Sequence, residues 1–275
     1  GVDVRRLLPP GFDDGAEAYQ VTIQGAAAID RHFLAHKGEE VGYLLSGQLE
    51  VVIRDRTQAL TRGDLVLSFS HRRPVLEVIA EKIPPTLLLV GTSMSAGKTM
   101  TGRVACSELN ALGYAVTGVK LTGAGRYRDI HSFHANGAER VYDFVDVGLP
   151  STVVPEKEYR AAIRPLLRHI ASERPDFMIC EAGASPLEPY NGAAAIDELG
   201  DSVACTILCA SDPYAVVGVK QAFGLEPDLV AGPATNTSSA IALVKKLTGL
   251  HGINIINPKR IPEFRDFLIR QLGLD

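Results

Sequence analysis

The sequence predicts an α/β protein in which a doubly wound, mostly parallel sheet follows a smaller β-rich region. From Pro84 onward, short apolar runs alternate with amphipathic segments of helix length, which is the pattern of β-α-β units. Before Pro84, the polarity alternates over residues 48–53, and a turn signal at 62–64 precedes another apolar run. We therefore expect a small β-rich domain over residues 1–83 and an α/β domain over residues 84–275.

The strands of the larger domain are expected where apolar runs are short. The first run, at 87–90, precedes the most informative motif of the chain. Runs of this kind are typical of parallel strands, which are buried on both faces. Further strands are expected at 115–121, 177–180, 203–209, 229–230 and 253–256.

Helices are expected between these strands. Residues 99–112 carry apolar residues on one face, and Gly113 should close this helix as a C-terminal cap. Between 156 and 173 the apolar residues also follow helical spacing, although Pro165 should start or kink that helix. Asp212-Pro213 is a helix start with a capping carboxylate, and residues 236–239 precede another helix that runs through Lys246.

Composition excludes several classes of protein. The 275 residues carry a net charge of −4, which argues against a protein that coats nucleic acid. No apolar stretch approaches the roughly 20 residues needed to cross a bilayer, so we expect a cytoplasmic protein with no membrane partner. The cysteines form no Cys-x-x-Cys pair and are expected to be reduced core thiols: Cys106, Cys180, Cys205 and Cys209.

A phosphate-binding loop is predicted between the first strand and the first helix of the larger domain. Small residues here would let backbone N–H groups converge on phosphate oxygens. Lys98 would bind the β and γ phosphates, and the Thr99 hydroxyl would coordinate Mg²⁺. The first glycine lies one residue earlier than the standard spacing places it. The predicted nucleotide-binding residues are Gly91, Thr92, Ser93, Met94, Ser95, Ala96, Gly97, Lys98, Thr99 and Met100.

A metal-binding carboxylate is predicted at the end of a neighbouring strand. The buried run at 177–180 ends in Glu181, followed by small residues that would let a substrate approach. Glu181 is the predicted Mg²⁺ ligand beside Thr99. Capping of the next turn is the alternative role for this carboxylate.

An anion site is predicted after the strand at 115–121. Lys120 opens from the end of this strand into a glycine-rich loop and could stabilise charge on a transferring phosphoryl group. Arg126 and Arg128 could add to this site, and Asp129 is a second candidate metal ligand. Structural roles for these residues stay open.

These motifs together resemble the dethiobiotin synthetase branch of P-loop proteins. The resemblance rests on Gly91–Thr99, on Lys120 with Thr122 and Gly123, and on the segment 180–184, and it spans about residues 84–258. It implies an ATP- and Mg²⁺-dependent enzyme with Lys98, Lys120 and Glu181 as catalytic residues. It departs at Ser93, where that family has an acidic residue, and no proline follows Lys120.

A second resemblance concerns the loop after Glu181. Residues 181–192 are similar to a segment of a P-loop family that includes D-glutamate N-acyltransferases, although Glu188 replaces that family's histidine. The resemblance implies a P-loop that could hold coenzyme A or a nucleotide. Taken with the loop after Lys120, the predicted substrate-binding residues are Thr122, Gly123, Arg126, Ser185, Tyr190 and Asn191. Both resemblances imply a sheet protein that commonly dimerises, so a homodimer or higher homo-oligomer is expected.

Other signals are weaker. The MinD and ParA relatives place an additional lysine where this chain has Ser93, which disfavours a membrane-partitioning ATPase. Residues 36–40 and 63–64 resemble the core of a cupin barrel. A metal site there would want a further histidine near position 34, where this chain has Leu34, and only His71 is available for the second motif. His131 and His134 have helical spacing and are more often solvated than metal-bound. Asn236 could contact a nucleotide base or cap its own helix.

The sequence therefore predicts a Mg²⁺-ATP-binding enzyme that activates a small carboxylate or carbamate oxygen as a phosphoryl intermediate. Such catalysis is mostly positioning and charge neutralisation, and it needs no covalent nucleophile. Two alternatives stay open: an acyl-CoA-dependent N-acyltransferase of an amino acid, and a nucleotide-dependent regulator or metallochaperone. The partner expected for the enzyme is a small-molecule substrate.

Overall fold

A computed structural model describes residues 2–6, 19–24, 39–53, 56–61, 65–69, 82–125 and 127–274. The chain divides into two compact units, residues 1–71 and 72–275. The units therefore meet earlier in the chain than the boundary that the sequence predicts near residue 83. The predicted boundary lies directly before β7 (Thr86–Gly91), the first strand of the second unit.

The first unit contains antiparallel strand pairs, as the alternating polarity predicts. β1 (Val2–Arg6) pairs with β2 (Tyr19–Ile23), β3 (Glu39–Tyr43) with β6 (Leu65–Phe69), and β4 (Gln48–Ile53) with β5 (Arg56–Thr61). The turn predicted at 62–64 and the residues 36–38 and His71 of the cupin-like pattern lie outside the described residues. The resemblance to a cupin barrel therefore stays a prediction.

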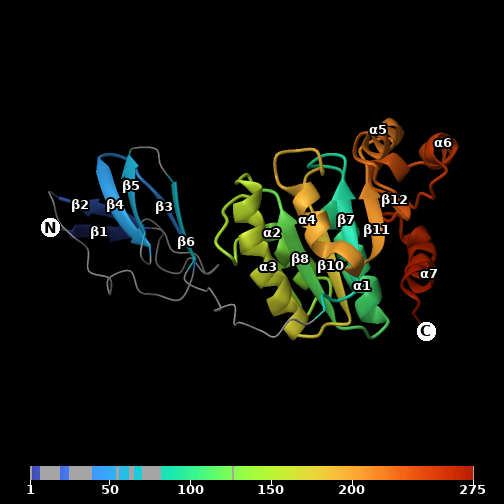
Figure 1. Ribbon diagram of the computed structural model, residues 1–275, viewed down its shortest axis with the longest axis horizontal. Coiled ribbons are helices and arrows are strands. Elements are labelled where there is room, and N and C mark those ends of the chain that lie inside the picture. The colour runs from blue at the N-terminus through green and yellow to red at the C-terminus, as the bar shows by residue number, and fades with distance from the viewer. Residues whose placement is uncertain are drawn as a thin grey trace. The chain divides into compact units, whose positions relative to one another are not determined.

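The second unit is built on a six-stranded sheet in which every pairing is parallel (Figure 1). The strand order is β12-β11-β7-β10-β8-β9. The central position of β7 places the loop after it between two neighbouring strand ends. The strands are β7 (Thr86–Gly91), β8 (Val116–Thr122), β9 (Arg140–Asp143), β10 (Phe177–Ala182), β11 (Val203–Cys209) and β12 (Leu229–Ala231).

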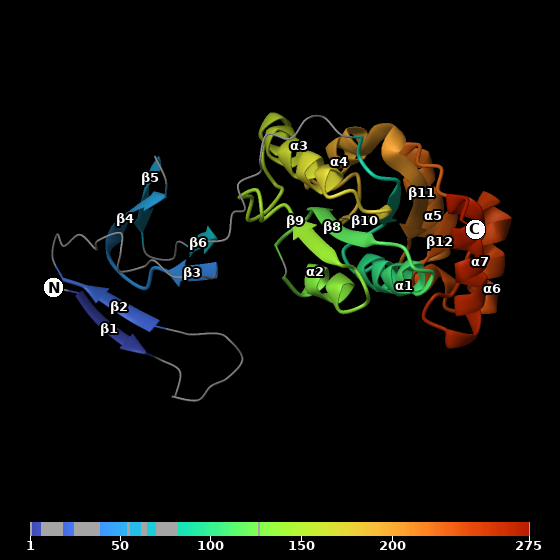
Figure 2. The same ribbon diagram turned by 90° about the horizontal axis from the view of Figure 1, so that it is seen from below.

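Helices cover both faces of this sheet, and Figure 2 shows α3 and α4 on one face with α1 and α2 on the other. The first face is covered by α3 (Glu156–Ser172), α4 (Gly192–Leu199), α5 (Pro213–Phe223) and α6 (Ser238–Thr248). The other is covered by α1 (Lys98–Ala111), α2 (Tyr127–His134) and α7 (Ile261–Leu272). Short 3₁₀ helices are η1 (Gly200–Ser202), η2 (Pro233–Thr235) and η3 (Pro258–Arg260).

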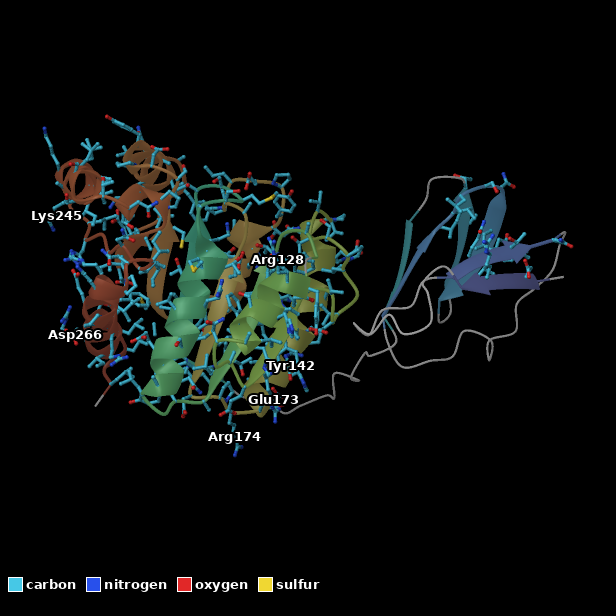
Figure 3. The ribbon with its side chains drawn as sticks, turned by 180° about the vertical axis from the view of Figure 1, so that it is seen from behind. Arg128, Tyr142, Glu173, Arg174, Lys245 and Asp266 are labelled. Carbon is cyan, nitrogen blue, oxygen red and sulfur yellow. The ribbon has the colours of Figure 1, made fainter. Side chains whose placement is uncertain are left out.

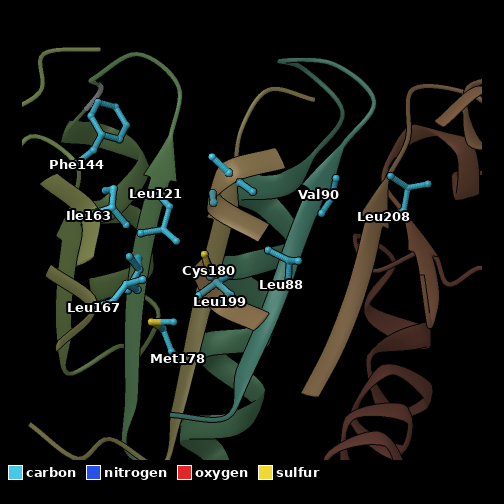
Figure 4. Packing of buried hydrophobic residues seen from close by; sticks show 14 of the residues in the cluster. Leu88, Val90, Leu121, Phe144, Ile163, Leu167, Met178, Cys180, Leu199 and Leu208 are labelled. Carbon is cyan, nitrogen blue, oxygen red and sulfur yellow. The ribbon is translucent and has the colours of Figure 1, made fainter. Parts of the chain in front are cut away.

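The core lies in two layers because successive strand residues point to opposite faces. Leu88 and Val90 of β7 pack with α3 and α4, as Figure 4 shows for Leu88, Ile163 and Leu199. Leu87 and Leu89 point to the other layer, with α1 and α7. All six residues of β7 are buried, which is why this strand reads as a continuous apolar run.

Hydrogen bonds and ion pairs attach the edge strand β9 to α3. Tyr142 donates a hydrogen bond to Glu173 over 2.7 Å, and Figure 3 shows the two side chains together. Arg140 forms an ion pair with the same carboxylate. These contacts fix the strand next to β8, whose carboxyl end carries Lys120.

Several expectations for the elements are wrong. The apolar run 253–256 is not a strand, although Gly252, directly before it, forms an isolated bridge to Val230. Of the two roles expected for Pro165, starting α3 is wrong, because the helix begins at Glu156 and continues through the proline. A kink at this position stays a prediction. One missing hydrogen bond is tolerated there because flanking residues such as Ile163 and Leu166 are buried in the core.

Other expectations are confirmed. α1 ends before Gly113, which has a positive φ of 89°. Asp212 caps α5 by accepting hydrogen bonds from the backbone N–H groups of Tyr214 and Ala215. The four cysteines are buried free thiols, and burial raises the pKa of Cys106 and of Cys209 to about 12. No helix among the described residues is both long and apolar enough to span a bilayer.

Candidate functional site

Two glycines shape the loop between β7 and α1, where the phosphate-loop motif lies. Gly97, directly before α1, has a φ of 97°, a left-handed conformation that glycine adopts without strain. At Gly91 an added Cβ would lie only 2.5 Å from Lys98 Nζ and from the Ala184 carbonyl oxygen. Glycine at this position therefore lets the lysine side chain fold back over the strand end.

Lys98 is enclosed by the loop that precedes it. Its ammonium donates hydrogen bonds to the carbonyl oxygens of Ser93 and Ala184, each over 2.9 Å, and the residue is 3% exposed. Burial lowers the pKa of Lys98, and the nearby Glu181 carboxylate opposes this effect. A positive charge thus lies between the first loop of the unit and the loop after β10.

Thr99 and Glu181 lie together, as the sequence predicts. The Thr99 hydroxyl donates a 2.9 Å hydrogen bond to Glu181 Oε2. Burial raises the pKa of Glu181, while Lys98 and then Lys120 act in the opposite direction. A hydroxyl and a carboxylate are hard oxygen donors and fit Mg²⁺, which binds proteins through one or two such groups and keeps water or phosphate oxygens as its other ligands.

A larger metal cluster is not part of this site. Among the described residues, no group of three or more His, Cys, Asp or Glu side chains could hold a metal ion. This includes His131 and His134, which are exposed and have their rings stacked 6.4 Å apart. The candidate metal donors among the described residues are thus the side-chain oxygens of Thr99 and Glu181.

Lys120 lies in a row of charged side chains across three strands. In register, Glu181 of β10 and Asp143 of β9 flank it on either side. Its ammonium donates to Asp129 Oδ2 over 2.5 Å and to the Ala124 carbonyl oxygen over 3.1 Å. Asp129, a predicted metal ligand, is therefore an ion-pair partner of Lys120 in this structure.

Asp143 was not predicted as a site residue. It is 4% exposed, and burial together with the neighbouring Asp146 carboxylate raises its pKa to about 7. A hydrogen bond from the Val145 backbone N–H and the charge of Lys120 oppose that rise. The row of Glu181, Lys120 and Asp143 therefore places one lysine between two buried carboxylates.

The loops after β8, β9 and β10 are tied together by Thr152, which sequence reasoning missed. The Thr152 hydroxyl accepts a hydrogen bond from the Gly123 N–H over 2.9 Å and donates to the Tyr190 carbonyl oxygen over 2.7 Å. The Asn191 amide donates to the carbonyl oxygens of Thr152 and Val154. Thr122 also donates to the Gly183 carbonyl oxygen.

The predicted substrate residues thus lie in one set of connected loops. Thr122, Gly123, Tyr190 and Asn191 all take part in the contacts around Thr152 or Gly183, and Ser185 is buried in the same loop as Tyr190. The Ser185 hydroxyl accepts a 3.2 Å hydrogen bond from the Leu187 N–H. Arg126 lies outside the described residues, and Arg128 is exposed on α2.

The rest of the phosphate loop contacts the loops after β11 and β12. Thr92 donates from its backbone to the Cys209 carbonyl oxygen and accepts from the Ser211 N–H, each over 3.0 Å. Ala96 is buried, and its carbonyl oxygen would be 2.2 Å from a Cβ at Gly232. The predicted residues Met94, Ser95 and Met100 are exposed.

Asn236 does not cap its own helix. The hydroxyl of Thr237 accepts the capping hydrogen bond from the Ala240 N–H over 3.1 Å. Asn236 is exposed in the loop that follows Gly232, and its carbonyl oxygen accepts from Asn254. Of its two predicted roles, contact with a nucleotide base is the one that stays a prediction.

Comparisons with known proteins found distant structural similarity. No protein-family model matches the chain, and the search of curated proteins gave no significant match. The chain is similar to HypB from Helicobacter pylori in complex with nickel, with 17% identity over 70% of this chain and 88% of that chain and a TM-score of 0.44.

Two further solved structures are similar to this chain with lower sequence identity and lower TM-scores. Chloroplast FtsY from Physcomitrella patens is 15% identical over 70% of this chain and 68% of that chain, with a TM-score of 0.43. A ParA family ATPase from Chlorobium tepidum TLS is 15% identical over 70% of this chain and 96% of that chain, with a TM-score of 0.37. The function proposed below therefore rests on the geometry of the site.

Proposed function

We propose that the second unit binds ATP with Mg²⁺ at the phosphate loop, and that the protein is an ATP-dependent ligase or synthetase. Its substrate would be a small molecule with a carboxylate or carbamate oxygen. The observation that carries this proposal is the 2.9 Å hydrogen bond between Thr99 and Glu181 beside the buried ammonium of Lys98. Lys98 and Thr99 open α1 directly after the predicted phosphate loop, and Glu181 lies near the carboxyl end of the neighbouring strand β10. A P-loop protein would hold its phosphates and metal in such an arrangement.

Each residue has a distinct role in this proposal. Lys98 would exchange its two carbonyl partners for phosphate oxygens, which are stronger acceptors because they are charged. Thr99 and Glu181 would hold the magnesium ion, which supplies charge neutralisation on the β and γ phosphate oxygens. Lys120 would stabilise the negative charge that develops as the terminal phosphoryl group leaves.

The acceptor substrate would bind in the loops joined by Thr152. These loops follow the carboxyl ends of β8, β9 and β10, where ligands of parallel sheets bind. The reaction needs no covalent nucleophile, and the buried thiols with raised pKa values are unsuited to that role. Positioning of two substrates is thus the main task of the site.

Calorimetry with Mg²⁺-ATP tests the proposal. We expect binding by the full chain and its loss in a Lys98→Ala variant. Lys246→Ala is the matched control, because Lys246 is an exposed lysine on α6, outside the site. Absence of binding by the unsubstituted chain, or equal binding by Lys98→Ala, would contradict the proposal.

A thermal-shift comparison separates the proposed ligase from the two alternatives. Stabilisation by acetyl-CoA but not by Mg²⁺-ATP would favour an N-acyltransferase. Stabilisation by Mg²⁺-ATP with consumption of ATP in a screen of small carboxylic acids would support a ligase. Nucleotide-driven association of the chain with no turnover in that screen would favour a regulator.

A further inference from the structure

The anion site predicted at Lys120 already contains a carboxylate. Asp129 Oδ2 lies 2.5 Å from the Lys120 ammonium, and the two side chains are only 13% and 6% exposed. A charged hydrogen bond of this length, largely shielded from water, is stronger than a surface ion pair. A phosphate oxygen therefore cannot reach this ammonium without competing with Asp129.

A second positive charge makes this position suitable for phosphate. The Lys98 and Lys120 ammonium groups are close enough that Lys120 contributes to the lowered pKa of Lys98. Glu181 lies opposite Lys120 in the sheet register, and the charges of Lys98 and Lys120 both oppose the rise that burial causes in the pKa of Glu181. An oxyanion shared by Lys98 and Lys120 would thus gain two attractive interactions, whereas Asp129 has a direct ion pair with only one of them.

Asp129 is easier to displace than the lysine. The Lys120 side chain is tied to its own loop through the Ala124 carbonyl oxygen, and a Cβ at Gly123 would lie 3.5 Å from Lys120 Cε. Asp129 is in the first turn of α2, an eight-residue helix in which only Ile130 and Phe133 are buried. The carboxylate could leave by a local shift of one helical turn.

We propose that Asp129 is an internal counter-ion of Lys120, and that the terminal phosphate of a bound nucleoside triphosphate displaces it. The proposal rests on the proposed nucleotide function. It differs from a role of Asp129 as a magnesium ligand, because a competitor weakens triphosphate binding whereas a metal ligand strengthens it. A diphosphate lacks the group that competes, so the effect of Asp129 depends on the third phosphate.

The test is calorimetry of the full chain with Mg²⁺-ATP and Mg²⁺-ADP, comparing Asp129→Asn with the unsubstituted protein. The variant should bind Mg²⁺-ATP roughly three- to tenfold more tightly, because it removes a competing ion pair. Its affinity for Mg²⁺-ADP should change less than about twofold, and the Mg²⁺ concentration required should not change. Asp129→Glu, which restores a carboxylate, should bring the ratio of the two affinities back towards the original value.

Glu139→Gln is the matched control, because Glu139 is exposed and its backbone N–H donates to the Val116 carbonyl oxygen, at the opposite end of β8 from Lys120. Weaker Mg²⁺-ATP binding by Asp129→Asn with a higher Mg²⁺ requirement would make Asp129 a metal ligand and overturn the proposal. Equal changes for ATP and ADP would overturn it as well.

Two further measurements, orthophosphate binding and amide hydrogen exchange, test the role of Asp129 independently of nucleotide binding. If the unsubstituted chain binds no nucleotide, the proposed function fails, but Asp129→Asn should still bind orthophosphate more tightly, and Lys120→Met should remove that gain. In the unsubstituted chain, the phosphate ligand should speed amide exchange in the first turn of α2. Unchanged exchange there would contradict displacement, even if Asp129→Asn were too unstable to study.

Discussion

Asp143 is a buried carboxylate whose titration should affect stability. Its side chain is buried beside Lys120 and Asp146, and its pKa is about 7, compared with about 3.9 in an unfolded chain. Between these values the folded protein holds a proton that the unfolded protein has released. The free energy of unfolding therefore decreases as pH rises from about 4 to about 7.

The Asp143→Asn variant tests this linkage. Its side chain keeps the oxygen that accepts from the Val145 N–H but does not titrate. Relative to the unsubstituted chain, the variant should gain on the order of 2–4 kcal/mol of stability between pH 4 and pH 8. Urea unfolding at several pH values measures the difference, and a difference that does not vary with pH would contradict the prediction.

The residues of the site differ in how far the sequence could predict them. Lys98 and Thr99 belong to a local motif whose spacing has a chemical reason, and Glu181 ends an apolar run next to it in the sheet. Thr152 has no such signal, because its partners Gly123 and Tyr190 are 29 and 38 residues away. Parallel register cannot be deduced from local patterns, so the row through Asp143 was missed as well.

At the level of the elements, Thr152 holds three loops through one hydroxyl. Thr152→Val keeps the shape of the side chain but leaves the buried Gly123 N–H and the partly buried Tyr190 carbonyl oxygen without this partner. We expect a loss of about 1–3 kcal/mol and faster amide exchange at Gly123. Thr152→Ser should restore both, whereas equal behaviour of the valine and serine variants would show that the hydroxyl does not tie the loops.

The start of α6 gives a second prediction, with two adjacent residues as a matched pair. Thr237→Ala should cost about 1 kcal/mol because it removes the capping hydrogen bond to the Ala240 N–H. Asn236→Ala should cost much less, since its exposed side chain makes no capping hydrogen bond. Chemical denaturation of the two variants checks this order, and a larger loss in Asn236→Ala would contradict the assignment of the cap.

Elements with strong apolar periodicity or caps were predictable, and those without them were not. β7 and α1 agree with prediction within one or two residues, because the strand is wholly buried and the helix ends before a glycine. β9 was missed because only two of its four residues are buried. The run at 253–256 was misjudged because burial alone does not create a strand without a neighbour in continuous register.

On the scale of the whole molecule, the site depends on the order of the strands. β7 lies between β11 and β10, so the phosphate loop has Glu181 on one side and the loops after β11 and β12 on the other. β8 lies beyond β10, which brings Lys120 next to Glu181. The sequence predicts that the strands are parallel, but it does not predict the order in which they lie in the sheet.

The second unit should fold and bind nucleotide without the first. Both hydrophobic clusters consist of residues from Ile83 onward, and the site residues from Gly91 to Asn236 belong to the same unit. A unit with its own core can fold alone. We expect a chain of residues 72–275 to unfold cooperatively and to bind Mg²⁺-ATP within about threefold of the full chain's affinity.

Circular dichroism measures the cooperative unfolding of this shorter chain, and calorimetry measures its binding of Mg²⁺-ATP. Cooperative unfolding without binding would mean that residues 1–71 contribute to the nucleotide site, and loss of cooperative unfolding would mean that they stabilise the sheet.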